Sequence, residues 1–133
     1  MTTTTSPDVA VVERGYAAFA GGDVPGLLAL LDPHVRWTEA AGSAYPGTHI
    51  GHDEVVGGLF ARLGQDWSTF APEVDELVDL GGRVLALGRL TGVHRGTGKS
   101  MSSRFAHLFT VTDGRVTAFE SINDTASALS AMT

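Results

Sequence analysis

Three tight turns divide the second half of the chain into four segments in which apolar and polar residues alternate. The turns are Gly81-Gly82, residues 96–99 (GTGK) and Asp113-Gly114, and Asp-Gly between alternating segments is a strong hairpin signal. Alternation puts successive side chains on opposite faces, so each segment is predicted to be a strand with one apolar face. The predicted strands cover residues 68–80, 83–95, 100–111 and 115–124. Such short connections join antiparallel neighbours, and the pattern therefore predicts a meander.

The first half of the chain carries helix signals. Residues 6–8 (SPD) provide a capping hydroxyl, a proline for the first turn and an acid at the positive end of the dipole. Apolar residues then recur at helical spacing up to Gly21-Gly22, which ends the first helix. Further helices are expected over residues 24–31, 52–64 and 125–132, with a strand at 35–42 and a loop at 42–51. This order predicts an α+β fold with helices on one face of a curved sheet.

Composition limits the class of protein. The chain has 133 residues, of which 43% are apolar and 18% charged, and we expect a disordered tail at 1–5 and one globular domain over 6–133. A net charge of −6 argues against nucleic acid and against an anionic membrane as partners. No leader-like segment and no membrane-length apolar run is visible, so a cytoplasmic protein is expected. The absence of cysteine excludes disulfides and thiolate metal sites.

The segment VRWTEAAG, residues 35–42, raises the first question about a site. Trp37 and Glu39 are two residues apart on the predicted strand, so their side chains share a face. A large aromatic suggests that this face is buried, whereas a carboxylate is seldom buried without a partner. Glu39 is therefore either a surface residue at a strand end or a carboxylate held in an apolar pocket. In the second case its pKa should rise, which suits proton transfer near neutral pH.

Strand parity extends this candidate pocket. If His107 faces inward, Phe105 and Phe109 do so as well, and the last strand contributes Phe119, Ser121 and Asn123. The result is an aromatic-walled cavity with one acid, one imidazole and neutral polar groups, as small-molecule sites usually have. His107 could donate to a substrate oxygen, act as acid/base partner of Glu39, or be a core histidine bonded to a backbone carbonyl.

No metal or cofactor is expected. His34, His49 and His52 lie on a turn and at a helix start rather than on one helix face, and no carboxylate stands at ligand spacing.

Three stretches carry a family resemblance: YAAFAGGDVPGLLALLDPHVRWTE, GTHIGHDEV and FAHLFTVTDGRVTAFESINDT. With them the chain resembles the nuclear transport factor 2-like superfamily, particularly its SnoaL-like and ketosteroid isomerase-like members. The resemblance implies a cone, also called a cystatin-like α+β barrel, in which three N-terminal helices and a curved antiparallel sheet enclose an apolar pocket. It also implies a homodimer formed through the outer face of the sheet. The same scaffold hosts several reactions and non-enzymatic modules, so the reaction does not follow from the fold.

The resemblance can be carried over residue by residue. Glu39 matches the carboxylate base of ketosteroid isomerases, whereas their oxyanion tyrosine falls at Gly15, one residue before Tyr16, and their protonated aspartic acid falls at Ala106 or His107. In SnoaL-type polyketide cyclases the histidine matches His107, while the catalytic aspartate falls at Ser121. The base of one family and the histidine of the other are thus present together.

Two functions are therefore predicted. In the first, the protein binds a small hydrophobic, oxygen-bearing molecule and catalyses an acid/base isomerisation, cyclisation or hydration, with Glu39 and His107 as catalytic residues and Asn123 or Tyr45 as further oxyanion donors. In the second, the same fold is a non-catalytic ligand-binding or dimerisation module. The residues predicted to line the binding site are Trp37, Tyr45, Tyr16, Phe60, Phe105, Phe109, Phe119, Ser121 and Asn123.

Overall fold

A computed structural model describes residues 6–133, and the tail predicted at residues 1–5 lies outside them. The helices are α1 (Pro7–Ala20), α2 (Val24–Leu30), α3 (Gly51–Val55), η1 (Val56–Phe60), α4 (Ala61–Asp66) and α5 (Thr125–Ala131). The strands are β1 (Leu31–Glu39), β2 (Gly47–Ile50), β3 (Trp67–Asp79), β4 (Arg83–His94), β5 (Ser100–Thr112) and β6 (Arg115–Asn123). The predicted α+β class is confirmed.

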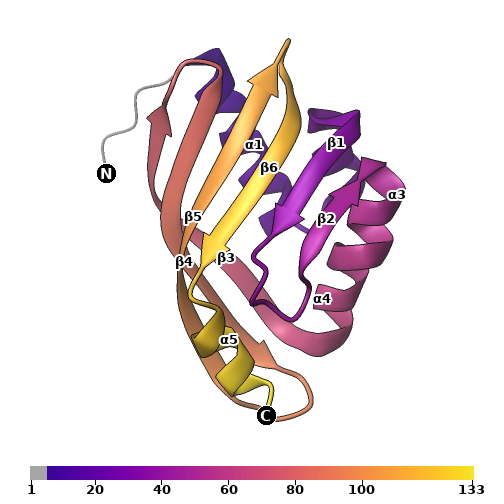
Figure 1. The fold of residues 1–133 in the computed structure, drawn as a ribbon, viewed down its shortest axis with the longest axis vertical. Coiled ribbons are helices and arrows are strands. Elements are labelled where there is room, and N and C mark those ends of the chain that lie inside the picture. Colours follow the sequence, from indigo (N-terminus) through magenta and orange to yellow (C-terminus); the bar gives the residue numbers. More distant parts are fainter. Residues whose placement is uncertain (1–5) are drawn as a thin grey trace.

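The strands form one curved, unclosed six-stranded sheet in the order β2-β1-β6-β5-β4-β3. Strands β3 to β6 form the predicted antiparallel meander. The sequence did not indicate that β1 joins β6 in parallel, with Trp37 opposite Phe119, so that the sheet is mixed. Figure 1 shows α1 crossing behind β5 and β6, and α3 and α4 beside β1 and β2. The helices and the concave face of the sheet thus enclose the interior.

The chain enters β1 earlier than expected, at Leu31 rather than at Val35, and leaves it at Glu39. Leu31 already has extended backbone angles, with φ −97° and ψ 136°. Pro33 lies two residues further on and prevents the helix from continuing, because it biases Asp32 away from helical angles and cannot donate a helical hydrogen bond. The start of α1 follows the prediction, since the Ser6 hydroxyl accepts from the backbone N–H of Val9 at 3.1 Å.

The third helix is interrupted in its middle. A π-helical turn, η1, separates α3 from α4 and contains Gly57 and Gly58. The Nδ1 atom of His49 lies 2.6 Å from where a Cβ on Gly58 would be, so the glycine admits the imidazole of β2 against the helix. The helix predicted over residues 52–64 is therefore not regular, since its two glycines lie in a π-helical turn.

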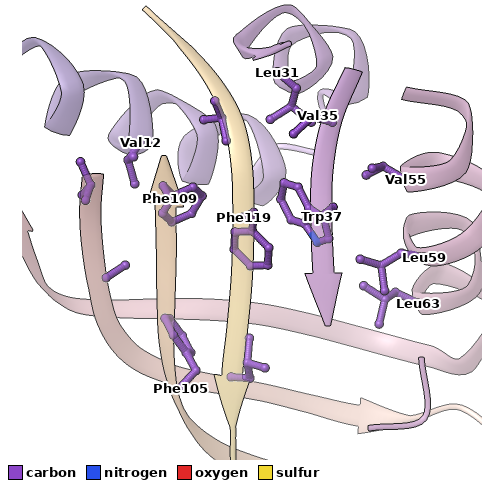
Figure 2. Close-up of a cluster of buried hydrophobic side chains, with 14 of the residues drawn as sticks. Val12, Leu31, Val35, Trp37, Val55, Leu59, Leu63, Phe105, Phe109 and Phe119 are labelled. Carbon is purple, nitrogen blue, oxygen red and sulfur yellow. The ribbon is translucent and has the colours of Figure 1, made fainter. Parts of the chain in front are cut away.

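The core lies between the helices and the inner face of the sheet. Figure 2 shows Val12 of α1, Trp37 of β1, Phe109 of β5 and Phe119 of β6 turned toward this space, with Leu59 on the facing helix. Ring centroids of Trp37 and Phe119 are 3.9 Å apart in a stacked arrangement. None of the helices within residues 6–133 has the length and hydropathy that a membrane crossing requires.

Replacing Gly88 of β4 with alanine should destabilise the fold by about 2 kcal/mol. A Cβ at this position would collide with the carbonyl oxygen of Glu73 and come within 2.7 Å of Cζ of Phe105. The matched control is Gly57→Ala, because a Cβ there meets no atom within 4 Å, and we expect it to leave stability unchanged or to raise it by up to about 1 kcal/mol. Urea unfolding measures both; equal stability of Gly88→Ala and the wild type would contradict the close packing at β4.

Candidate functional site

An apolar cavity of about 120 Å³ lies between α1, the α3–α4 stretch and the concave sheet face. Its wall combines aromatic and aliphatic side chains with a few polar ones. Ten of the eleven residues predicted for the site border it: Tyr16, Trp37, Glu39, Tyr45, Phe60, His107, Phe109, Phe119, Ser121 and Asn123. A cavity of this size compares with those that hold a single benzene-sized ring.

Glu39 ends β1 and contributes its carboxyl group to the cavity wall. The indole N–H of Trp37 donates to Oε2 at 3.0 Å. Desolvation raises the pKa of Glu39 to about 7, against a smaller opposing effect of the Trp37 hydrogen bond. The carboxyl group can therefore give or take a proton near neutral pH.

His107 lies in the middle of β5 and is 7% exposed. Its Nδ1 is 2.7 Å from the hydroxyl oxygen of Tyr16 on α1, and its ring stacks on Phe105 with centroids 3.8 Å apart. Burial lowers the pKa of His107 to about 3, so the imidazole is neutral at physiological pH. Of the three roles considered for it, a core histidine bonded to a backbone carbonyl does not match, because its partner is the tyrosine hydroxyl.

The direction of the hydrogen bond between Tyr16 and His107 sets the tautomer of His107. Burial raises the pKa of Tyr16, so the phenol keeps its proton. When this O–H donates to Nδ1 of His107, the imidazole proton is on Nε2. In that arrangement His107 offers an N–H donor at Nε2, whereas donation from Nδ1 to the Tyr16 oxygen would make Nε2 an acceptor.

Two polar atoms of the site have no hydrogen-bond partner among residues 6–133: Oε1 of Glu39 and Nε2 of His107. In this part of the chain the fully buried side-chain atom without a partner is Nε2 of His49. Both residues border the cavity, and Glu39 also borders a shallow surface pocket beside Ala40, Gly47 and Ile122. No direct hydrogen bond joins the two residues within the described chain, so each is available to a ligand.

Tyr45 contributes its ring to the cavity, but its hydroxyl group is already engaged. The phenol donates to Oδ2 of Asp66 at 2.6 Å and accepts from the indole N–H of Trp67 at 3.1 Å. The guanidinium of Arg62 lies over the ring, 5.0 Å from its centroid. These contacts hold the loop between β1 and β2 against α4 and β3. The hydroxyl group of Tyr45 is therefore used in structural contacts and is not free to donate to an oxyanion.

Phe105 does not border the cavity, in contrast to the prediction. Its side chain shares the inner face of β5 with His107 but lies apart from Trp37 and Leu59 (Figure 2). The absence of a side chain at Gly88 leaves room for its ring, which lies over that glycine on β4. Phe105 supports the imidazole from behind instead of contacting a ligand.

Ser121 and Asn123 complete the polar part of the wall from β6. Ser121 is buried, whereas Asn123 donates weakly to Oγ of Ser103 at 3.4 Å. Ser103 in turn donates to the carbonyl oxygen of Asp124 at 2.7 Å, which ties β5 to the start of α5. Both residues can orient a ligand oxygen near Glu39 and His107.

Several lining residues were not assigned to the site from the sequence: Phe19, Leu59, Leu63, Trp67 and Phe70. The first three belong to predicted apolar helix faces, which mark burial but do not separate core from cavity. Within residues 6–133 no group of three His, Cys, Asp or Glu side chains is placed to share a metal ion. His52, for example, has its Nε2 atom 3.0 Å from the carbonyl oxygen of Leu31.

Comparison with known proteins identifies the family. The profile of the SnoaL-like domain matches residues 12–119. The chain belongs to the SnoaL-like family. An uncharacterised protein of Mycobacterium tuberculosis is 34% identical over 116 residues, covering 86% of both chains. This confirms the family resemblance seen in the sequence.

Solved structures place this SnoaL-like chain among nuclear transport factor 2-like proteins. One such protein from Burkholderia thailandensis superimposes with a TM-score of 0.91 and 36% identity over 98% of this chain and 99% of its own. TerC, co-crystallised with polyporic acid, matches with a TM-score of 0.87 and 25% identity over 96% and 98%. The cone-like scaffold is therefore shared across the family.

The buried acid and imidazole should give this SnoaL-like protein an unusual pH profile of stability. The pKa of Glu39 rises on folding, so its contribution is present below about pH 4.5 and is lost as the pH rises toward 7. The pKa of His107 falls on folding, so its contribution is present above about pH 6.5 and is lost as the pH falls toward 3. Between about pH 4.5 and 6.5 the two slopes oppose each other, and we expect a nearly flat profile.

Glu39→Gln should remove the contribution of Glu39 to the pH dependence of the free energy of unfolding, so that only the contribution of His107 is seen. Its free energy of unfolding should rise by about 3 kcal/mol between pH 4.5 and 6.5, relative to the flat wild type. Urea titrations at a series of pH values measure this, with Glu13→Gln on the exposed side of α1 as the matched control. A Glu39→Gln profile parallel to that of the wild type would show that the carboxyl group is not desolvated.

Proposed function

We propose that the cavity binds a small, apolar, oxygen-bearing molecule and that Glu39 exchanges a proton with it while His107 holds its oxygen. One observation carries the proposal: Glu39 and His107 border the same apolar cavity, and the hydrogen bonds of their side chains within residues 6–133 involve only Oε2 of Glu39 and Nδ1 of His107. Groups that are costly to bury are usually hydrogen-bonded within a protein. A ligand with a polar end would supply their missing partners.

The chemistry follows from the two protonation states. With a pKa of about 7, Glu39 is ionised in a large fraction of molecules at neutral pH and can remove a proton next to a carbonyl group. The negative charge then develops on the carbonyl oxygen, where the Nε2–H of neutral His107 donates a hydrogen bond. Return of the proton from Glu39 to another carbon completes an isomerisation. Cyclisation and hydration need the same base and the same donor.

Tyr16 is proposed as a positioning residue. Its hydroxyl fixes the orientation and tautomer of His107 through Nδ1, although its own oxygen is not aimed at the reacting atom. This differs from the ketosteroid isomerase pattern, in which a tyrosine itself forms the oxyanion hole. The donor would here be the imidazole, with the tyrosine behind it.

The alternative is a non-catalytic module that binds the same class of ligand. It is favoured by Ser121, which stands where SnoaL-type cyclases carry their catalytic aspartate, and by the lack of a direct hydrogen bond between Glu39 and His107 in the described chain. TerC shows that a protein of this fold can be co-crystallised with a small organic molecule. Binding and catalysis must therefore be measured separately.

Exchange of α-protons in D₂O tests the catalytic proposal directly. Enolisable cyclic ketones such as cyclohexanone and β-tetralone are incubated with the protein, and deuterium incorporation is followed by NMR. The wild type should accelerate exchange, and Glu39→Gln should reduce the rate at least about 100-fold. Tyr16→Phe should reduce it by about tenfold, because His107 loses its fixed tautomer.

Binding of the same ketones is read from tryptophan fluorescence, since Trp37 and Trp67 both border the cavity. Glu39→Gln should keep this binding, and Glu13→Gln on the exposed side of α1 should retain wild-type exchange. If the wild type binds the ketones but promotes no exchange in any of them, the non-catalytic module is the better description.

We further propose that the outer face of the sheet pairs with a second copy of the chain, as the resemblance implies. Outward-facing apolar side chains form a stripe across β4, β5 and β6, with Leu85 opposite Leu108 and Ala106 opposite Ile122. Ile122 is 60% exposed. An apolar stripe of this kind on a sheet face is typical of a subunit interface.

Ala106→Arg should convert the proposed dimer to a monomer, because it places a charge between Leu87 and Ile122 of the stripe. Leu80→Arg is the matched control, since Leu80 is exposed at the turn between β3 and β4. Sedimentation velocity distinguishes the two states. A wild-type monomer, or a dimer unaffected by Ala106→Arg, would reject this interface.

A further inference from the structure

A second cavity, of about 260 Å³, adjoins the first. It lies among α1, α2, α4 and β3, on the side of the inner cavity away from Glu39 and His107, which do not border it. The two cavities share six lining residues: Phe19, Leu27, Phe60, Leu63, Trp67 and Phe70. The two cavities are therefore adjacent compartments, and the side chains of these shared residues separate them.

Three phenyl rings from three elements form the division. Phe19 of α1 contacts Phe60 of η1 and Phe70 of β3, with ring centroids 5.7 and 6.2 Å apart. Phe60 also contacts Trp37, at 5.6 Å. All three rings are only partly buried, and rotation about side-chain bonds is fast compared with most enzyme turnover. A ligand can pass the rings without any movement of the strands.

The two compartments differ in polarity. The inner one carries Glu39, His107, Ser121 and Asn123 at its strand end. The lining of the outer one is aromatic, aliphatic or glycine, apart from Asp23. The Asp23 side chain is occupied in capping α2, where it accepts from the N–H of Gly26 at 2.9 Å. The path thus favours a molecule with a polar end inside and an apolar remainder outside.

We propose that the ligand is a two-part molecule that occupies both compartments. Its oxygen-bearing ring lies in the inner cavity, and an apolar extension passes Phe19 and Phe60 into the outer cavity. The orientation of the ring rests on the proposed function, because Glu39 and His107 define the polar end. The extension rests only on the shape and lining of the outer compartment. The substrate class is therefore a ring ketone or phenol with an alkyl or aryl tail, rather than a single small ring.

Gly64 offers a way to close the outer compartment without disturbing the inner one. It lies on α4, borders the outer cavity alone, and has no atom within 4 Å of a built Cβ. Gly64→Leu therefore places a side chain in open space. Gly57→Leu is the matched control, since Gly57 also lies in a helical segment with open space at its Cβ and borders neither compartment.

Phenol and para-heptylphenol serve as probes, with affinities measured by isothermal titration calorimetry. Each buried methylene strengthens binding about fourfold, so para-heptylphenol should bind the wild type at least tenfold more tightly than phenol. Gly64→Leu should weaken para-heptylphenol about tenfold and phenol less than twofold. Gly57→Leu should change neither. Equal affinities of the two probes for the wild type, equal losses in the two glycine variants, or no binding of either probe would overturn the proposal.

The result is separable from that of the exchange experiment. If para-heptylphenol gains affinity through the outer compartment while no ketone exchanges its protons, the two-part ligand stands and the catalytic proposal fails. If ketones exchange and the tail gains nothing, the reverse holds.

Discussion

The parallel pairing of β1 with β6 is the contact on which the site depends. It joins the first strand of the chain to the last and places Trp37 opposite Phe119, whose rings stack. That stack holds the indole in position to donate to Glu39. Because side chains alternate along a strand, a slip of one residue in this pairing would turn Glu39 to the outside of the sheet. The register of two strands thus decides whether the protein has a buried acid at all.

Burial then sets the chemical state of the site. An ionised carboxylate and a charged imidazole are both costly to desolvate, and the structure responds by shifting the two pKa values in opposite directions. Near pH 6 both groups are neutral, so the cavity holds no net charge from this pair. Tyr16 satisfies one nitrogen of His107 and leaves the other free. Both side chains are therefore buried in their neutral forms, which costs less free energy than burying charges. Oε1 of Glu39 and Nε2 of His107 have no hydrogen-bond partner within residues 6–133.

Much of this could be predicted from the sequence, because it depends on local patterns. Turn residues and alternation marked the meander, and parity put Glu39 on the face of Trp37 and His107 on the face of Phe109, without deciding which face is the inner one. The parallel β1–β6 pairing has no local signal, since its partners are far apart in the chain. The contact of Tyr16 with His107 spans 91 positions, and the sequence placed Tyr16 only as a neighbour of Gly15.

Tyr45 and Phe105 show a different limit. Tyr45 borders the cavity, but Asp66 and Trp67 occupy its hydroxyl group. Phe105 has the expected parity, yet its ring lies over Gly88 on the neighbouring strand. Parity tells which face a side chain leaves from, whereas its final contacts depend on residues from other elements. A prediction made from one strand at a time therefore identifies the face that lines the cavity, but not the contacts that each side chain on it makes.

The cavity wall is divided between rigid and adaptable parts, and this division connects the fold to the range of chemistry in the family. Glu39, His107, Ser121 and Asn123 lie on strands whose positions are fixed by hydrogen-bonded neighbours. Phe19 and Phe60 lie on helices, and Phe60 ends a π-helical turn, a feature that often occurs at functional sites. Precise chemistry needs the first kind of support, since proton transfer tolerates little misplacement. Under the proposed function, a change in the helical wall would alter the size of the ligand that fits while Glu39 and His107 stay in place on the strands.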